Sequence, residues 1–160
     1  MIPNGVPLER FALPRRPVRG RILMVGRLAP PKRPDLAMRA LASVREQVPD
    51  AELHVVGDGS LRTRPKRSPP SSGSASAVRF LGTREDVPEL LAEAECALLA
   101  SDYEGSPLAV VEAMAASVAV VATRSAGPAS SSRPGVTGAI APKGDAAGPR
   151  GALLRRPRRP

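Results

Sequence analysis

The chain has 160 residues, of which 42% are hydrophobic, and a formal net charge of +9 at pH 7. This length suits one domain with its own core, and no apolar run approaches the roughly 20 residues that span a bilayer. The N-terminus also lacks the hydrophobic segment of a signal peptide. We therefore expect a soluble, cytoplasmic protein with no membrane-spanning segment.

The excess of basic residues is the one feature that suggests a polyanion as partner. Basic side chains concentrate in three proline-rich stretches, 15–21, 62–67 and 150–159, whereas aromatic residues make up only 2% of the chain. Because surfaces that bind single-stranded nucleic acid stack bases on aromatic rings, we expect no specific nucleic acid as partner. A non-catalytic protein that binds polyanions through these stretches stays open as an alternative.

Short apolar runs bounded by glycine and aspartate alternate with longer amphipathic runs along the chain. The short runs predict strands at Arg21–Val25, Glu52–Val56, Val78–Leu81, Cys96–Leu99, Ala119–Ala122 and Ala139–Ala141. The longer runs predict helices at Pro34–Gln47, Val87–Ala94 and Pro107–Ala116. The short, nearly continuous apolar character of these strands favours a parallel sheet covered on both faces, so the chain predicts an α/β fold with a doubly wound parallel sheet over residues 21–142.

Two parts of the chain depart from this alternation. Residues 65–77 stand where a helix is expected between the second and third strands, but Pro69, Pro70 and several serines oppose one. We expect irregular structure there. Residues 143–160 are rich in proline and arginine, which predicts a disordered basic tail.

The single cysteine and the single histidine both lie in strand-like runs. Cys96 follows an alanine and a glutamate and precedes Ala97, while His54 alternates with Leu53 and Val55. We interpret Cys96 as a small buried hydrophobic residue and His54 as structural. No disulfide, metal site, histidine-based triad or cofactor is predicted.

Small residues follow four of the predicted strands. They are Gly26, Gly57, Gly82 and Ser101. Ligands of doubly wound sheets bind beyond the carboxyl ends of the strands, so we expect the functional site along this edge. Gly57 and the nearby Gly59 are interpreted first as turn residues.

Residues 101–116, SDYEGSPLAVVEAMAA, contain the start of the third predicted helix. Ser106 suits an N-cap and Pro107 the first helical position. Leu108 and the two residues after it carry no acidic side chain, so the free N–H groups and the positive end of the helix dipole are left to attract an anion.

Glu112 in the same helix has two interpretations. Its helical neighbours, Leu108, Ala109, Ala115 and Ala116, are apolar, which predicts a helix buried all round. A buried carboxylate then needs partners such as sugar or ribose hydroxyls. The alternative is a solvated glutamate on an ordinary amphipathic helix, and the residues alone leave both open.

Taken in order, several motifs resemble the retaining nucleotide-sugar glycosyltransferases of the GT-B fold, the glycosyl transferases group 1 (family four). These motifs are IPNGVPLERF, VGRLAPPKRPDLAMRA, LHVVGDG, VRFLG, Glu104 and Glu112 separated by seven residues and followed by AMA, and GVTG. The resemblance covers roughly residues 1–142. It implies a Rossmann-like domain equivalent to the second half of such an enzyme, with residues 1–20 resembling the interdomain linker.

The resemblance also implies roles for individual residues. Arg27 and Lys32, beside Gly26, would hold the diphosphate of the donor, although without the motifs they would read as solvated surface cations. Glu104 would meet the transferred sugar and Glu112 the ribose hydroxyls. The backbone near the phosphates would come from Gly105, Ser106, Pro107 and Leu108, and the base would lie near Gly82 and Arg84.

The implied reaction transfers a hexose from a nucleoside-diphosphate sugar to an acceptor hydroxyl with retained configuration. Arg27, Lys32 and the helix dipole would stabilise the departing diphosphate, so no metal is required. The sequence begins at the link to the second domain and the acceptor domain is missing, so we expect a fragment that binds donor and is inactive alone. A sugar-nucleotide epimerase of the same fold fits the glutamate spacing less well.

One hypothesis joins the irregular segments. Ser130, Ser131 and Ser132 stand where the family has an acidic residue followed by apolar ones. With suitable codons, a neighbouring reading frame encodes Glu-Leu-Val there and an amphipathic helix at 65–77. The terminal Pro-Arg-Arg-Pro similarly hides Leu-Ala-Asp-Pro. Paired insertions and deletions would then account for all three segments, and a pseudogene product without function is a further alternative. Resequencing the gene tests this hypothesis.

Overall fold

The short apolar runs form one parallel sheet. The computed structural model describes residues 5–61, 75–103, 107–123 and 138–141. Its strands are β1 (Arg21–Val25), β2 (Glu52–Val56), β3 (Val78–Gly82), β4 (Cys96–Leu99), β5 (Ala119–Thr123) and β6 (Gly138–Ala141). Their order is β3-β2-β1-β4-β5-β6, and every neighbouring pair is parallel. This is the order of a Rossmann-like doubly wound sheet, so the predicted fold class is confirmed.

Every predicted strand is present, and three are one residue longer than expected. The additions are Gly82 in β3, Thr123 in β5 and Gly138 in β6. Apolar patterning finds the centre of a buried strand well, but its ends depend on backbone pairing with the neighbouring strand.

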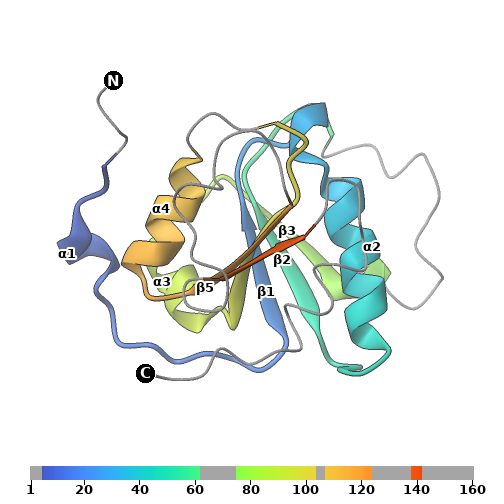
Figure 1. Cartoon of the computed structure of the whole chain (residues 1–160), viewed down its shortest axis with the longest axis horizontal. Helices are drawn as coiled ribbons and strands as arrows, with labels where there is room; N and C mark the ends of the chain where they lie inside the picture. The colour runs from blue at the N-terminus through green and yellow to red at the C-terminus, as the bar shows by residue number, and fades with distance from the viewer. Residues whose placement is uncertain (1–4, 62–74, 104–106, 124–137, 142–160) are drawn as a thin grey trace.

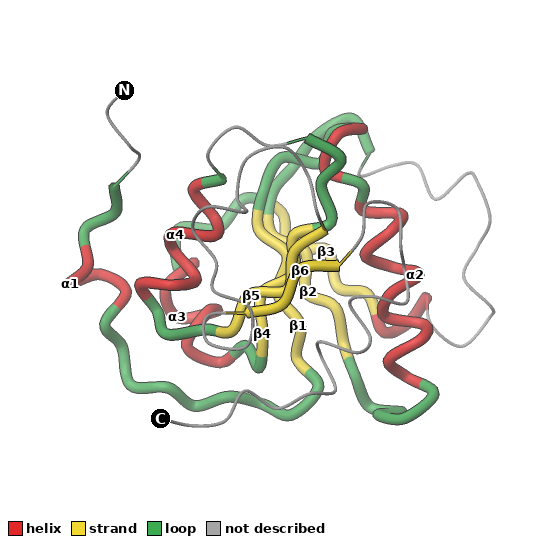
Figure 2. Tube along the Cα trace, viewed as in Figure 1, coloured by secondary structure: helices red, strands yellow, loops and turns green. Residues whose placement is uncertain are grey.

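Helices cover both faces of the sheet (Figures 1 and 2). Helix α2 (Pro34–Arg45) lies on one face, and α3 (Val87–Glu93) and α4 (Leu108–Ala115) lie on the other, with the short α1 (Leu8–Phe11) beside them. Two 3₁₀ turns, η1 (Pro30–Lys32) and η2 (Ala75–Ala77), complete the described elements. Each predicted helix is found. Helices α2 and α3 begin where expected and end two and one residues early, and α4 is one residue shorter at each end.

The sheet separates two hydrophobic cores. On the α2 face, Leu36 packs in one cluster with Leu53. On the opposite face, Leu91 and Val110 pack in a second cluster with Leu23. Neighbouring strand residues therefore point to alternate sides. The middle of β1, β2, β4 and β5 is buried on both sides, as the apolar runs predicted, whereas Arg79 and Phe80 in the edge strand β3 are exposed.

Helix α4 differs from its prediction in two respects. Pro107 has extended backbone angles (φ −72°, ψ 108°) and stands at the N-cap, so the helix begins at Leu108. The prediction of a helix buried all round is wrong, because Leu108 and Met114 are 45% and 37% exposed. The many alanines of α4 make it uniformly apolar in sequence, but only the side that carries Val110 and Ala113 reaches the core.

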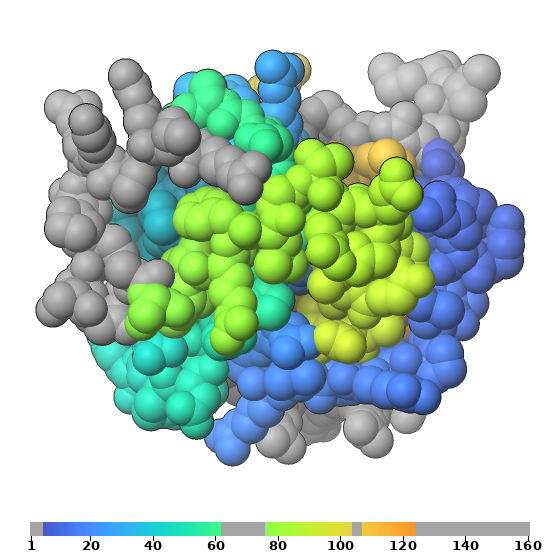
Figure 3. Space-filling view, turned by 180° about the vertical axis from the view of Figure 1, so that it is seen from behind, coloured from blue at the N-terminus to red at the C-terminus, as the bar shows by residue number. Residues whose placement is uncertain are grey.

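The segment after α1 runs along the end of α3, and Figure 3 shows the two side by side. The guanidinium of Arg15 donates to the carbonyl oxygens of Leu91 at 2.5 Å and Ala94 at 2.8 Å. The backbone N–H of Arg16 donates to the carbonyl of Ala92 at 2.9 Å. Arg15, in the basic stretch 15–21, is therefore used to hold the domain together, which weakens the polyanion interpretation for that residue.

Several predictions fall on residues outside the described ranges. These are most of the irregular segment 65–77, the serines at 130–132, the tail 143–160 and the basic stretches 62–67 and 150–159. They stay predictions.

Candidate functional site

The loops that follow the first three strands are hydrogen-bonded to one another at the carboxyl edge of the sheet. The N–H of Gly26 donates to the carbonyl of Val56 at 2.9 Å, and that of Gly57 donates to the carbonyl of Gly82 at 2.8 Å. The N–H of Leu28 continues the pattern with the carbonyl of Asp58 at 2.9 Å. The structure therefore brings Gly26 and Gly82, two of the expected site residues, to one edge.

Gly57 and Gly59 let these loops pack backbone against backbone. A Cβ atom on Gly57 would lie 2.1 Å from the carbonyl oxygen of Gly26, and one on Gly59 would lie 2.3 Å from that of Leu28. Both glycines have positive φ, 126° and 156°. Their interpretation as turn residues is consistent with this geometry, and their small size sets the shape of the loop after β1.

That loop carries both cations expected to hold a diphosphate. Arg27 is exposed and Lys32 is half-buried, while Leu28 between them is fully buried and anchors the loop. A Cβ atom on Gly26 would lie 3.9 Å from Cε of Lys32, so the lysine stem passes over Gly26. Gly26, Arg27 and Lys32 thus belong to one short loop that leaves the sheet at its carboxyl edge.

Arg84 has a partner that the sequence did not suggest. Its Nε and Nη2 atoms donate to Oδ1 and Oδ2 of Asp86 at 2.7 and 2.5 Å, in an exposed two-point contact. The guanidinium holds the pKa of the Asp86 carboxyl below its usual range. Arg84 is therefore already engaged beside the start of α3, and its expected position near a base stays a prediction.

Glu112 is half-buried, between the two alternatives that the sequence left open. Burial raises the pKa of its carboxyl, and the positive charge of Arg10 on α1 partly offsets this effect. Within the described ranges, no hydrogen bond or ion pair to the Glu112 carboxylate is found. Its expected neighbours Glu104, Gly105 and Ser106 lie outside those ranges.

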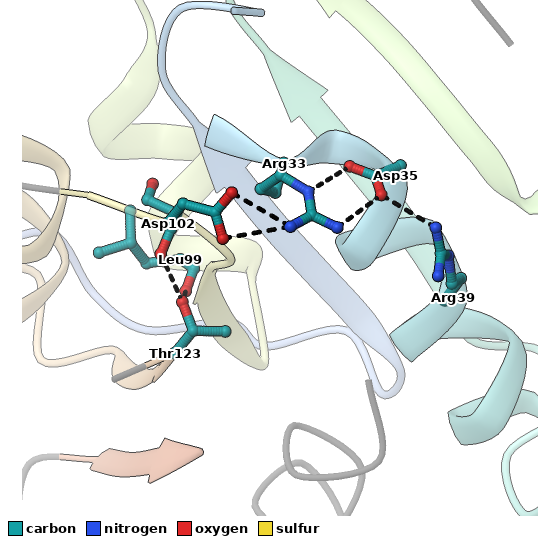
Figure 4. A network of polar contacts seen from close by, with 7 residues as sticks. Arg33, Asp35, Arg39, Leu99, Asp102 and Thr123 are labelled. Carbon is teal, nitrogen blue, oxygen red and sulfur yellow. Dashed lines mark hydrogen bonds and ion pairs between the residues drawn. The ribbon is translucent and has the colours of Figure 1, made fainter. Parts of the chain in front are cut away.

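A polar network joins the loop after β1 to the loop after β4 (Figure 4). Arg33 follows Lys32, and its Nη1 donates to both carboxylate oxygens of Asp102 at 3.1 Å. Its Nε and Nη2 donate to Asp35 at 2.9 and 3.0 Å, and Arg39 contacts the same carboxylate at 3.1 Å. Sequence reasoning missed Arg33 and Asp102, which lie 69 residues apart.

The cysteine and the histidine are where the strand patterns predicted them. Cys96 is buried in β4, and burial raises the pKa of its thiol. His54 is 7% exposed, and its Nε2 lies 3.0 Å from Oε2 of Glu52. The part of the chain that the structure describes contains no cluster of three or more His, Cys, Asp or Glu suited to a metal ion. None of its helices has the length and apolar character needed to cross a membrane.

A doubly wound parallel sheet whose carboxyl edge carries glycine turns and basic residues defines a Rossmann-like domain of the kind that binds nucleotides. The comparison with known families is specific: residues 19–155 match the model of the glycosyl transferases group 1. The chain belongs to this family, and the resemblance drawn from its motifs is confirmed.

Curated relatives from bacteria share about a third of their residues with the chain. It is 34% identical over 128 residues to an Escherichia coli UDP-Gal:alpha-D-GlcNAc-diphosphoundecaprenol alpha-1,3-galactosyltransferase, covering 71% of this chain and 33% of that protein. It is 34% identical over 143 residues to a GDP-mannose-dependent alpha-(1-6)-phosphatidylinositol monomannoside mannosyltransferase of Mycolicibacterium smegmatis, covering 82% of this chain and 36% of that protein. The chain therefore spans about a third of the length of these two relatives.

Solved structures of GT-B enzymes share the fold. TarM superimposes with a TM-score of 0.81 at 20% identity, over 90% of this chain and 30% of TarM. Anabaena HepE, solved in complex with UDP, superimposes with a TM-score of 0.72 at 26% identity, over 84% of this chain and 38% of HepE. In each case the chain matches one part of a larger enzyme.

Proposed function

We propose that this chain is the donor-binding half of a retaining glycosyltransferase. It binds a nucleoside-diphosphate sugar for transfer of a hexose to an acceptor hydroxyl. The relatives named above include one that uses UDP-Gal, one that depends on GDP-mannose and one solved with UDP. A nucleoside diphosphate is the part that these donors share.

One observation carries the proposal. Arg27 and Lys32 lie on a single loop at the carboxyl edge of the sheet, and this loop is bonded to the segment that leads into the two glutamates. The bond joins the N–H of Asp102 to the carbonyl of Pro31 at 2.8 Å. Two cations lie on one loop, and the adjacent loop leads to the N-terminus of α4. This arrangement favours binding of an anion with more than one phosphate.

The chemistry that this arrangement supports is electrostatic. Negative charge develops on the diphosphate as the bond to the sugar breaks, and fixed cations at that position stabilise the transition state more than the ground state. Arg27 and Lys32 would supply these charges. Each charge-assisted contact to a phosphate is worth about 1.5–3 kcal/mol.

Glu112 would bind the ribose hydroxyls, and Glu104 would meet the transferred sugar. The half-buried Glu112 carboxylate suits such a role because hydroxyl donors would replace the water it has lost. The residues of this sequence correspond to the donor half of the enzyme, so we expect them to bind donor without transferring sugar on their own.

Isothermal titration calorimetry with UDP and with GDP tests the proposal. Lys32→Ala and Arg27→Ala should each weaken binding roughly 10- to 100-fold, the equivalent of one charge-assisted contact. Glu112→Ala should also weaken it. Arg19→Ala removes an exposed cation at the opposite edge of the sheet, just before β1, and should leave the affinity unchanged. If the folded wild-type chain binds neither nucleotide, the proposal is wrong.

A further inference from the structure

Asp102 contacts the residues on both sides of Lys32. The N–H of Asp102 donates to the carbonyl of Pro31, the residue before Lys32, at 2.8 Å. The Asp102 carboxylate accepts both of its 3.1 Å hydrogen bonds from Arg33, the residue after Lys32. A single residue of the loop after β4 thus contacts the backbone of the residue before the expected diphosphate cation and the side chain of the residue after it.

The Arg33 guanidinium is fully engaged by acidic partners. It makes a two-point contact with Asp35 and a second contact with Asp102, and its side chain is 29% exposed. With two carboxylates against its one charge, Arg33 is not a free cation for a phosphate. Its geometry suits a residue that sets the position of others.

The backbone of Arg33 adds a second observation. Its φ and ψ are 49° and 55°, the left-handed conformation that glycine adopts most readily. An arginine at this position accepts a backbone conformation that is unfavourable for it, and the side-chain contacts to Asp35 and Asp102 compensate for that strain.

The loop after β4 is itself anchored to the next strand. Thr123, at the end of β5, is 1% exposed, and its hydroxyl donates to the carbonyl of Ser101 at 2.8 Å. Ser101 is completely buried and precedes Asp102. The contacts therefore run without a break from the end of β5, through Ser101 and Asp102, to the backbone around Lys32.

We propose that Arg33 is a positioning residue for donor binding: with Asp102, it fixes Lys32 relative to the segment that leads into Glu104 and α4. The inference rests on the proposed function. A diphosphate must contact the β1 loop and the start of α4 together, so binding is tightest when these two loops are held in place before the ligand arrives. Binding of the nucleoside part, which Glu112 would contact, does not depend on the contact between Arg33 and Asp102.

A double-mutant cycle tests the inference. Arg33→Gly removes the side chain and suits the left-handed backbone, Asp102→Asn removes the charge of its partner, and both are combined in a third variant. The affinity for UDP and GDP is measured by calorimetry, that for uridine and guanosine by ligand-observed NMR, and folding by thermal unfolding. Arg39→Ala is the control, because it loses a contact to Asp35 without touching Asp102.

Each single variant should bind the preferred diphosphate about tenfold more weakly, and the double variant no more weakly than the singles. Affinity for the nucleoside should stay unchanged, and Arg39→Ala should bind as wild type does. Arg33→Lys keeps the charge but cannot bridge two carboxylates, so it should show the same loss if Arg33→Gly does not fold.

Three outcomes overturn the inference. Unchanged diphosphate affinity in folded Arg33 variants, fully additive losses in the double variant, or an equal loss for the nucleoside would each refute it while leaving the proposed function in place. Absence of binding by the folded wild-type chain would overturn the proposed function and this inference together.

Discussion

Replacing Gly57 by alanine tests whether the loops after β1 and β2 pack as closely as the structure shows. A Cβ atom at this position would lie 2.1 Å from the carbonyl oxygen of Gly26 and 2.9 Å from its carbonyl carbon. Both are backbone atoms, so no side-chain rotation relieves the overlap. The φ of Gly57, 126°, is also one that residues with a Cβ rarely adopt.

Two costs contribute to the expected loss of stability. The unfavourable backbone conformation costs about 1–3 kcal/mol. Forcing the two loops apart costs about 1–3 kcal/mol more, as in overpacked cores. The sum, about 2–6 kcal/mol, is a large part of the roughly 5–15 kcal/mol that stabilises a domain. At about 2–4 °C per kcal/mol for a chain of this size, the melting temperature should fall by about 4–24 °C.

Thermal unfolding followed by circular dichroism measures this effect, with two glycine variants as controls. Gly26→Ala meets the same kind of backbone cost, with φ 149°, but its nearest neighbour atom is 3.9 Å away. Gly5→Ala has nothing within 4 Å and should not change the melting temperature. If Gly57→Ala unfolds no earlier than Gly26→Ala, the two loops are not in backbone contact and the reasoning fails.

Three further variants test individual side chains. Arg15→Ala leaves two carbonyls at the end of α3 without their donor and should lower the free energy of unfolding by about 1–3 kcal/mol in urea titrations, whereas an unchanged midpoint would show that water replaces the guanidinium. His54 and Arg79 hold the pKa of Glu52 below its usual range, so this carboxylate stabilises the fold above its unfolded pKa, and that contribution is lost as the pH falls through the lower folded value. In Glu52→Gln, the free energy of unfolding should therefore fall less steeply as the pH drops below about 4.3, the normal glutamate pKa. A pH dependence equal to that of the wild type in this range would contradict this. Glu112→Gln should raise the melting temperature at pH 7 while it weakens nucleotide binding.

The strands and the helix order could be predicted because they depend on local patterns. The centre of a run such as Arg21–Val25 is apolar on consecutive residues, and only a sheet covered on both faces buries such a centre. The exposure of Leu108 and Met114 could not be predicted in the same way. A helix as rich in alanine as α4 has little contrast between its faces, so its orientation is decided by how it packs on β4 and β5.

The contact between Arg33 and Asp102 could not have been predicted from the sequence. The two residues meet because β1 pairs directly with β4, which places the loop after one strand beside the loop after the other. Even with the strand order known, the left-handed backbone of Arg33 decides where its guanidinium points, and no sequence pattern marks an arginine for that conformation. The charged residues expected at the site, Arg27, Lys32 and Glu112, were predicted from their motifs, whereas the contact between Arg33 and Asp102 needed the structure.

Glu112 connects the stability of the domain with its proposed function. Burial raises the pKa of this carboxyl in the folded chain, so the ionised form at pH 7 is less favourable in the folded state than in the unfolded one. Glutamine has a similar shape and no charge, so Glu112→Gln should stabilise the fold by at most about 0.5 kcal/mol, because solvent screens a half-exposed group. A residue that serves only the fold would show the opposite sign. A higher melting temperature together with weaker binding of UDP or GDP is the result expected of a binding residue. A lower melting temperature with unchanged binding would assign Glu112 to the fold alone.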